Sequence, residues 1–213
     1  KAAIAKARAH GIRVVLASGR PIDGIRAKLI ELDITSDQDY VLHFNGSIVE
    51  NVATGEVIHR EILSGKAAKQ IASLAKRLNV NTHAFSQELG LITPAISQYT
   101  KVEAEINGID INVMDFDQLA DDHPIIKAMI VDEPEKLTQV IAQLPKELYL
   151  QYTIVQSAPH FLEFLNTKSN KGAGLKMIAD HVGVAASEVM CMGDAENDHH
   201  MIEYAGLGIA MAN

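Results

Sequence analysis

The chain has 213 residues, of which 47% are hydrophobic, and its formal net charge is −8 at pH 7. This length suffices for one large domain or two small ones, each with a hydrophobic core. The acidic balance and the lack of a basic run argue against a nucleic acid or an anionic membrane surface as the main partner. No apolar run approaches the ~20 residues of a membrane span.

The single cysteine, Cys191, lies inside an apolar run at 189–192. We interpret it as a small buried hydrophobe rather than a nucleophile, and no disulfide can form within the chain. We therefore expect a reducing, cytoplasmic compartment. The first helical run has no N-cap residue before it, and the last apolar segment stops near Asn213. We expect the chain to be an interior portion of a longer protein.

The first elements indicate an α/β sheet. Residues 12–18, IRVVLAS, form a continuous apolar run, which predicts a strand buried on both faces of a parallel sheet. A helix should follow to about Leu32, and Pro21 suits its first turn. Further strands are predicted at 40–44, 47–51 and 56–62. The first of these ends at Asn45-Gly46, which is a turn signal. This alternation is typical of a doubly wound sheet.

The middle of the chain has a different, α+β pattern without phosphate-loop signals. Its predicted elements are helices at about 64–78, 95–105 and 133–143, and strands near 81–92, 109–115, 126–131 and 148–165. The α/β pattern then resumes with a helix at 171–182, a strand at 189–192, a helix at 196–204 and a strand at 207–211. We expect residues 1–60 and 167–213 to form one domain around one parallel sheet, with 61–166 inserted as a second domain.

Three strand or helix junctions carry polar chemistry. In open α/β sheets, ligands bind at the carboxyl ends of the strands. At Ser18-Gly19, a hydroxyl and the N–H groups entering a helix suit a phosphate oxygen. At Asn170-Lys171, the start of a helix, a lysine supplies a positive charge for phosphate. At the third junction Asp194 ends a strand, and Asn197-Asp198 follow one turn later.

Each junction also has a purely structural interpretation. Ser18 could cap the following helix, and Lys171 could be an ordinary solvated lysine. Asp194, Glu196 and Asp198 would suit the positive end of a helix dipole. These interpretations do not explain why hydroxyl, lysine and carboxylates occur at comparable junctions. Carboxylates suit Mg²⁺, and a cation with a lysine and a hydroxyl would neutralise a transferring phosphoryl group. The combination favours a phosphate site.

Three segments carry a family resemblance: VVLASGRP, SNKGAGL and GDAENDHHMIEYAGLGIAMAN. They resemble motifs two, three and four of the haloacid dehalogenase-like (HAD) hydrolases, and more narrowly the Cof-type branch with its bacterial sugar phosphatases. The resemblance runs along nearly the whole chain. The Gly-Asp-x-x-Asn-Asp pattern is specific, whereas the serine and lysine motifs are weak alone. The resemblance implies a Rossmann-like core (1–60 and 167–213), a cap domain (61–166) and Mg²⁺-dependent hydrolysis of phosphomonoesters.

The resemblance also implies residue roles on the phosphate side. Ser18 and Gly19 would bind the phosphate, and Lys171 would stabilise its charge, which makes Ser18 and Lys171 the catalytic candidates. Asn197 would contact the phosphate. Asn45 would lie near the mouth of the substrate site and bind the substrate there.

On the metal side, the resemblance implies that Asp194 binds Mg²⁺ and that Asp198 supports the metal site. The nucleophile and general acid of the family belong to an Asp-x-Asp-Gly-Thr motif, which this chain lacks. The stretch 37–39 lacks the Gly-Thr. So does 115–117, which follows an apolar stretch but lies within the insert. We expect the nucleophile to precede Lys1 and the chain alone to be inactive.

The sequence thus predicts a Mg²⁺-dependent phosphatase for small phosphorylated metabolites, above all sugar phosphates, acting through an aspartyl-phosphate. A phosphomutase or phosphotransferase of the same superfamily, or a non-catalytic phosphometabolite-binding protein, remains an alternative. Adjacent histidines at 199–200 point about 100° apart on a helix, so we expect surface residues rather than a zinc site. Polar cap residues that the pattern does not distinguish are His83, Gln87, Glu88, Tyr99 and Lys101.

Overall fold

The computed structural model describes residues 1–212 and divides into two compact units. The first unit is Lys1–Glu61 with the described residues from Lys168 onward, and the second is Ile62–Thr167. These limits differ by one residue from the domain boundaries expected from the sequence. The roles of the units as core and cap stay predictions. Among the described residues, no helix combines the length and apolar character needed to cross a membrane.

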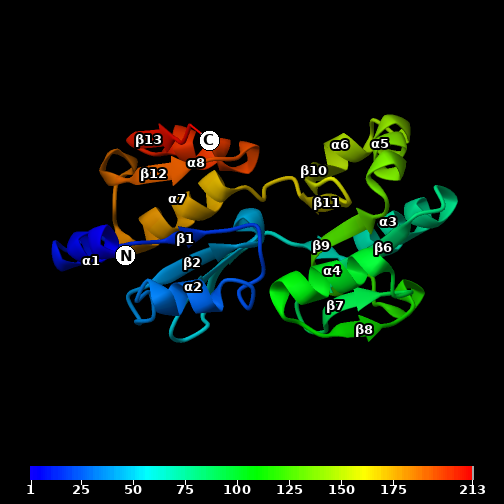
Figure 1. The fold of residues 1–213 in the computed structure, drawn as a ribbon, viewed down its shortest axis with the longest axis horizontal. Coiled ribbons are helices and arrows are strands. Elements are labelled where there is room, and N and C mark those ends of the chain that lie inside the picture. Colours follow the sequence, from blue (N-terminus) through cyan, green and yellow to red (C-terminus); the bar gives the residue numbers. More distant parts are fainter. Residues whose placement is uncertain (213) are drawn as a thin grey trace. The chain divides into compact units, whose positions relative to one another are not determined.

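The first unit begins with helix α1 (Ala2–Ala9) and a four-stranded sheet in the order β1-β2-β3-β4. The strands are β1 (Leu16–Ala17), β2 (Tyr40–His43), β3 (Ile48–Asn51) and β4 (Val57–Arg60). β1 pairs with β2 in parallel, and the other pairs are antiparallel. Helix α2 (Arg26–Glu31) connects β1 to β2 (Figure 1).

Alternating side chains on β2 place one helix on each face of this sheet. Val41 packs with Ile25 and Leu29 at the α2 side. Its neighbour Leu42 packs with Val49 and with Ile178 of α7 (Lys171–Val182). Successive strand residues point to opposite faces, so Val41 and Leu42 contribute to the apolar clusters on the two sides of the sheet. The loops at the ends of β1 and β2 thereby lie beside the start of α7.

The C-terminal part of the first unit follows α7. It contains 3-10 turns at Ala186–Glu188 and Glu196–Asp198, strand β12 (Met190–Gly193), helix α8 (His199–Tyr204) and strand β13 (Leu207–Ala210). β12 and β13 form a two-stranded parallel sheet. Helix α8 packs against both strands and against α7 (Figure 1).

The expectation of one parallel sheet in this unit is wrong. β1 and β12 belong to different sheets, because β1 pairs only with β2 and β12 only with β13 in the described part of the chain. The sheet that contains β1 is mixed, since the short connections between β2, β3 and β4 permit antiparallel pairing and are too short for a parallel crossover. Apolar runs identified the strands but carried no information about which edges pair.

The second unit is an α+β arrangement around a seven-stranded sheet in the order β10-β11-β9-β6-β7-β8, with β5 also paired to β9. The strands are β5 (Leu63–Ser64), β6 (Asn81–Ser86), β7 (Gly90–Thr93), β8 (Ile111–Val113), β9 (Pro124–Val131), β10 (Tyr152–Ala158) and β11 (Phe161–Asn166). The helices are α3 (Gly65–Arg77), α4 (Gln98–Asn107), α5 (Pro134–Gln143) and α6 (Leu148–Gln151). A further 3-10 turn lies at Phe116–Gln118.

The two faces of this second sheet differ in character. One face carries Ala128 and Ile130 of β9 and packs with Ile71 of α3 and Leu137 of α5 in an apolar core. Lys127 and Met129, which alternate with these residues along β9, point to the opposite face. That face meets α4, whose Thr100 and Glu103 lie within bonding distance of buried polar groups on the strands.

Candidate functional site

The loop after β1 is held by its own backbone and by β2. The Ser18 N–H donates to the Leu42 carbonyl at 2.9 Å, and the Ser18 hydroxyl oxygen accepts from the Arg20 N–H at 3.1 Å. The N-cap of α2 is Ile25. Ser18 therefore does not cap that helix, and the structural interpretation of this residue fails. Its hydroxyl hydrogen is still available to a ligand.

The turn after β2 lies directly against this loop. The Asn45 N–H donates to the Ser18 carbonyl at 3.0 Å. A Cβ on Gly19 would lie 2.9 Å from the Asn45 Oδ1, and one on Gly46 would lie 2.2 Å from the Asn170 carbonyl oxygen. Gly46 is thus required by close approach to backbone, whereas a side chain at position 19 would displace the Asn45 side chain. The turn at Asn45-Gly46 therefore contacts both the loop after β1 and Asn170, the N-cap residue of α7.

The start of α7 buries the candidate lysine. Asn170 caps the helix, because its Oδ1 accepts from the Ala173 N–H at 2.8 Å. Lys171 is only 6% exposed, and its Nζ donates to the Asp198 Oδ1 at 2.5 Å. The interpretation of Lys171 as a solvated surface lysine is therefore wrong. A Cβ on Gly172 would lie 2.5 Å from the His200 carbonyl oxygen, so this helix start is fixed against α8.

Asp198 is a buried carboxylate whose two oxygens are both engaged. Oδ1 accepts from Lys171, and Oδ2 accepts from the N–H groups of Asp194 at 2.9 Å and Ala195 at 3.1 Å. Burial alone would raise the pKa of Asp198. The hydrogen bonds from Lys171 and the backbone outweigh it and hold the pKa below its usual value. A Cβ on Gly193 would lie 2.4 Å from the Asp198 Cβ, which explains the glycine before Asp194.

Asp194 and Asn197 are the last two residues of the candidate site around Lys171. The Asp194 side chain is exposed at the carboxyl end of β12. The Asn197 Nδ2 donates to the Asn45 Oδ1 at 2.8 Å, while the Asn197 Oδ1 is buried without a hydrogen-bond partner. Hydrogen bonds between side chains thus join Asn45 to Asn197 and Lys171 to Asp198. Asp194 is linked to this group through its backbone N–H.

The oxygen donors here fit part of a magnesium shell. Among the described residues, no three His, Cys, Asp or Glu side chains gather as a metal-binding group. The Asp194 carboxylate and the unpartnered Asn197 Oδ1 are hard oxygen donors of the kind that Mg²⁺ prefers. Because both oxygens of Asp198 already accept hydrogen bonds, that residue is suited to support the site rather than to coordinate the cation.

Other candidates from the sequence lie elsewhere. His199 and His200 are exposed, and the His199 Nε2 lies 3.3 Å from the Glu203 Oε1. Asp115 lies in the second unit, where its carboxylate accepts from the Asp117 N–H and caps a 3-10 turn. Of the polar cap residues, His83 is fully buried. The hydrogen bond between Asn45 and Asn197 was missed, because no local pattern connects residues so far apart in the sequence.

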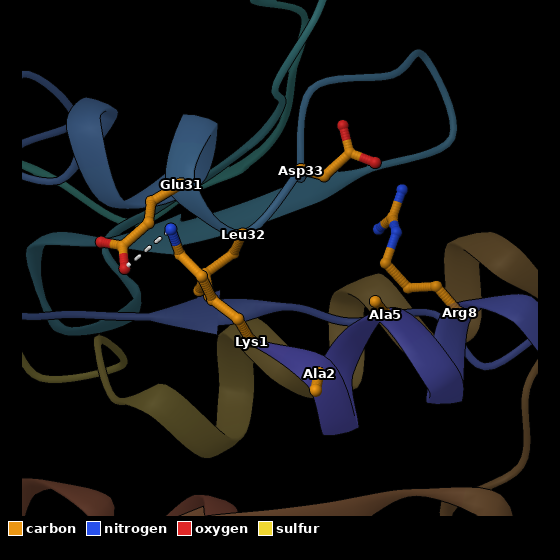
Figure 2. A pocket seen from close by; sticks show the side chains of 7 residues that line it. All are labelled: Lys1, Ala2, Ala5, Arg8, Glu31, Leu32 and Asp33. Atoms are coloured by element: carbon orange, nitrogen blue, oxygen red, sulfur yellow. Dashed lines mark ion pairs between the residues drawn. The ribbon is translucent and has the colours of Figure 1, made fainter.

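A cavity of about 370 Å³ lies in the first unit, between α1 and the end of α2 (Figure 2). The Lys1 Nζ lies 3.5 Å from the Glu31 Oε1 at its wall. Arg8, another lining residue, reaches Asp39 with two nitrogens at 2.7 and 3.0 Å and ties α1 to the sheet. No residue of the group around Lys171 lines this cavity, so it is separate from the candidate site.

A family model described as haloacid dehalogenase-like hydrolase matches residues 1–213. YxeH of Bacillus subtilis (strain 168), a candidate phosphatase by its name, is 38% identical over 213 residues, covering 99% of this chain and 78% of its own. The HMP-PP phosphatase of Citrobacter koseri is 26% identical over 216 residues, covering 100% of this chain and 76% of its own.

Solved structures have a similar fold. A haloacid dehalogenase-like hydrolase from Bacteroides thetaiotaomicron matches with a TM-score of 0.85 and 28% identity, covering 99% of this chain and 79% of that chain. TM0651 from Thermotoga maritima matches with a TM-score of 0.82 and 25% identity, covering 98% of this chain and 77% of that chain. The α/β fold class predicted from the sequence is confirmed.

Proposed function

Because this chain belongs to the haloacid dehalogenase-like hydrolases and is a phosphatase of the Cof-type branch, we propose that it hydrolyses sugar phosphates with Mg²⁺ as cofactor. The observation that carries this proposal is the buried Lys171–Asp198 pair, with Ser18, Asp194 and Asn197 on the adjoining loops. The HMP-PP phosphatase, a relative named for a small phosphorylated compound, supports a small-molecule substrate. A cytoplasmic location stays a prediction.

In this proposal Lys171 neutralises charge on the phosphoryl oxygens. Its Nζ is held by Asp198 at 2.5 Å, so the cation is positioned before the substrate arrives. The Ser18 hydroxyl and the N–H groups near Gly19 contribute hydrogen bonds to the phosphate. Fixed donors of this kind stabilise developing charge without the cost of reorganising during the reaction.

Asp194 would hold the cation, and Asp198 would support it by fixing the Asp194 backbone. When bound, Mg²⁺ neutralises charge on the oxygens of the transferring group. The aspartyl-phosphate expected for such an enzyme needs a nucleophile from an Asp-x-Asp-Gly-Thr motif, and the 213 residues contain no such motif. We therefore assign that role to no residue of this chain. The core and cap roles of the two units belong to the same proposal.

The proposal is tested with protein expressed from its complete gene, by phosphate release from a panel of sugar phosphates at saturating Mg²⁺. Asp194→Ala should lower the turnover by about 10²–10³-fold, which is the usual effect of losing one preorganised electrostatic partner. His199→Ala is the matched control, because His199 is exposed on the following helix, and it should retain normal turnover.

Near-normal turnover of the Asp194 variant would contradict the assigned metal role. Conversion of the sugar phosphate to an isomer without phosphate release would instead identify a phosphomutase. Binding of sugar phosphates without any turnover would identify a binding protein.

A further inference from the structure

The turn that ends β2 has a strained backbone. Three consecutive residues have positive φ, namely Phe44 at 48°, Asn45 at 58° and Gly46 at 89°. Glycine adopts this region freely and asparagine tolerates it, whereas a bulky residue such as phenylalanine is an outlier there. Phe44 is only 4% exposed, and its ring centroid lies 5.3 Å from that of His43 at the end of β2. The buried ring therefore anchors a backbone conformation that phenylalanine does not favour.

This conformation directs two consecutive N–H groups to the loop after β1. The Phe44 N–H donates to the Arg20 carbonyl at 3.1 Å, and the Asn45 N–H donates to the Ser18 carbonyl at 3.0 Å. In an extended strand, consecutive N–H groups point to opposite sides, so an extended backbone at Phe44 would separate these two donors. Strain that is maintained by such hydrogen bonds points to a functional requirement.

The hydrogen bond from Asn45 fixes the orientation of the peptide group between Ser18 and Gly19. In a trans peptide group the C=O and the N–H point in opposite directions. Because the Ser18 carbonyl points to the turn, the Gly19 N–H points away from it. Within residues 1–212 this N–H has no hydrogen-bond partner, and Gly19 is partly exposed. The loop thus offers two donors to a ligand, the Gly19 N–H and the Ser18 hydroxyl hydrogen.

Without the bond from the turn, this peptide group would have no fixed orientation. Glycine is the most permissive residue, so the peptide group before Gly19 rotates with little steric resistance. A rotated peptide would present the Ser18 carbonyl oxygen to the ligand instead of the Gly19 N–H. Phosphate oxygens accept hydrogen bonds, so a backbone N–H binds them and a carbonyl oxygen repels them. The orientation that the turn fixes is therefore the one that suits a phosphate.

We propose that Phe44 is a positioning residue, whose left-handed backbone locks the Ser18–Gly19 peptide with the Gly19 N–H directed to the phosphoryl group. Phe44 acts through the loop after β1 and not on the substrate itself. Its buried ring anchors the turn, and the turn fixes the donor. The inference rests on the phosphate site of the proposed function, but not on the identity of the sugar phosphate.

The test compares Phe44→Ala with Phe44→Gly in protein expressed from its complete gene. Both variants lack the ring, but a positive φ is roughly 10-fold less accessible to alanine than to glycine. The readout is the affinity for inorganic phosphate with Mg²⁺ present, measured by calorimetry. A hydrogen bond to a charged group contributes about 10–100-fold to affinity, so Phe44→Ala should bind phosphate at least about 10-fold more weakly than the unsubstituted protein. Phe44→Gly should bind phosphate more tightly than Phe44→Ala, with a loss of less than about 10-fold.

A control variant separates this role from a loss of packing. Leu29 is 1% exposed in the apolar cluster on the α2 side of the same sheet. Leu29→Ala removes buried apolar volume from the first unit but none of the hydrogen bonds of the turn. It should lower the free energy of unfolding and leave the phosphate affinity of the folded molecules unchanged. If Phe44→Ala did not fold, a 10-fold loss in Phe44→Gly would overturn the inference, because the ring rather than the backbone would then set the affinity.

Two other results would also overturn it. One is equal phosphate affinity in Phe44→Ala and Phe44→Gly, because the positive φ would then have no effect on the site. The other is a Phe44→Ala protein that loses stability but keeps its phosphate affinity, because Phe44 would then be purely structural. Failure of the substrate proposal is a separate outcome: a protein that binds inorganic phosphate but hydrolyses no sugar phosphate still yields the comparison. A protein that binds no inorganic phosphate overturns both the phosphate site and this inference.

Discussion

Among the described residues, each unit of the molecule buries one lysine against a carboxylate. Lys171 in the first unit is 6% exposed and lies 2.5 Å from an oxygen of Asp198. Lys127 in the second unit is 2% exposed and lies 2.9 Å from an oxygen of Glu163. By burial and distance alone the two pairs are alike.

The surroundings of the two pairs differ. Lys127 lies within β9, where it also meets Glu103 of α4 at 3.6 Å and the Phe85 ring at 4.9 Å. Ser157 of β10 donates to the same Glu163 oxygen at 2.7 Å. These partners come from paired strands and a packed helix. The Lys127 pair is therefore part of the interior that joins α4 to the sheet.

The Lys171 pair lies where a helix begins and a strand has just ended. Asp198 receives two backbone N–H groups, and beside it are an exposed carboxylate, Asp194, and an unpartnered oxygen of Asn197. The Lys127 pair also has an unpartnered buried oxygen, the Glu163 Oε2. Neither a buried ion pair nor an unpartnered oxygen therefore marks a site by itself. The two pairs differ in position, because the Lys171 pair lies beside a strand end with an exposed carboxylate, where ligands bind in α/β sheets.

The first prediction tests whether the interior lysine, Lys127, stabilises the fold without contributing to turnover. Lys127→Met leaves Glu163 and Glu103 buried without a cation, and removing one partner of a buried pair costs about 3–5 kcal/mol. The free energy of unfolding is measured with urea by far-UV circular dichroism, because the chain has no tryptophan. The turnover of the molecules that remain folded should be unchanged.

Lys136→Met is the control, since Lys136 is 41% exposed in its side chain and pairs with Asp132 at 3.2 Å. A partly exposed pair of this kind contributes about 1 kcal/mol or less. If Lys127→Met were as stable as this control but lacked turnover, the second lysine would be functional and the comparison would fail.

The second prediction concerns the site lysine. Lys171→Ala should lower the turnover of sugar-phosphate hydrolysis by about 10²–10³-fold at saturating Mg²⁺, because a positioned charge is lost from the phosphoryl group. Lys176→Ala is the control on the same helix, where an exposed lysine pairs with Asp180. Turnover is counted per folded molecule, from the circular dichroism of each sample. A Lys171 variant that loses stability but keeps its turnover would make the two lysines equivalent.

The helices that the sequence predicted correctly are those that depend on a local pattern of apolar residues. Helices α5 (Pro134–Gln143) and α7 (Lys171–Val182) follow their apolar periodicity and lie within one residue of the ranges expected. The first strand did not follow its pattern: the apolar run at 12–18 contributes only Leu16–Ala17 to the sheet. Apolar runs report burial, but hydrogen bonding between strands depends on distant segments. Pairing therefore could not be derived from them.

The candidate site shows the same limit. The residue types at the three junctions could be predicted, because strand ends and helix starts are local features. The burial of Lys171 could not, since its partner Asp198 is 27 positions away. Nor could the contact of Asn45 with Asn197, 152 positions apart. The positive φ of Phe44 has no sequence signal either, because phenylalanine is not a residue that favours this conformation.

The third prediction, with the smallest expected effect, concerns how the free energy of unfolding depends on pH. His83 is fully buried in the second unit, where its Nδ1 lies 3.4 Å from the Thr100 Oγ1 and its Nε2 lies 3.1 Å from the Met129 sulfur. Burial, and then the charge of Lys127, lower the pKa of His83 from 6.5 to about 3. Well above pH 6.5 the imidazole is neutral in both the folded and the unfolded protein and contributes no pH dependence.

Between about pH 6.5 and pH 3 the unfolded chain binds a proton at this histidine and the folded protein does not. The free energy of unfolding should therefore fall with decreasing pH, by up to about 1.4 kcal/mol per pH unit from this group. In His83→Gln, which cannot titrate, the slope of the free energy of unfolding between pH 6.5 and pH 4 should be smaller by that amount. His200→Gln removes an exposed histidine and should keep the original slope. Equal slopes in the protein and the His83 variant would mean that the imidazole is protonated when folded, and that the polar interior around Lys127 is open to water as a ligand site would be.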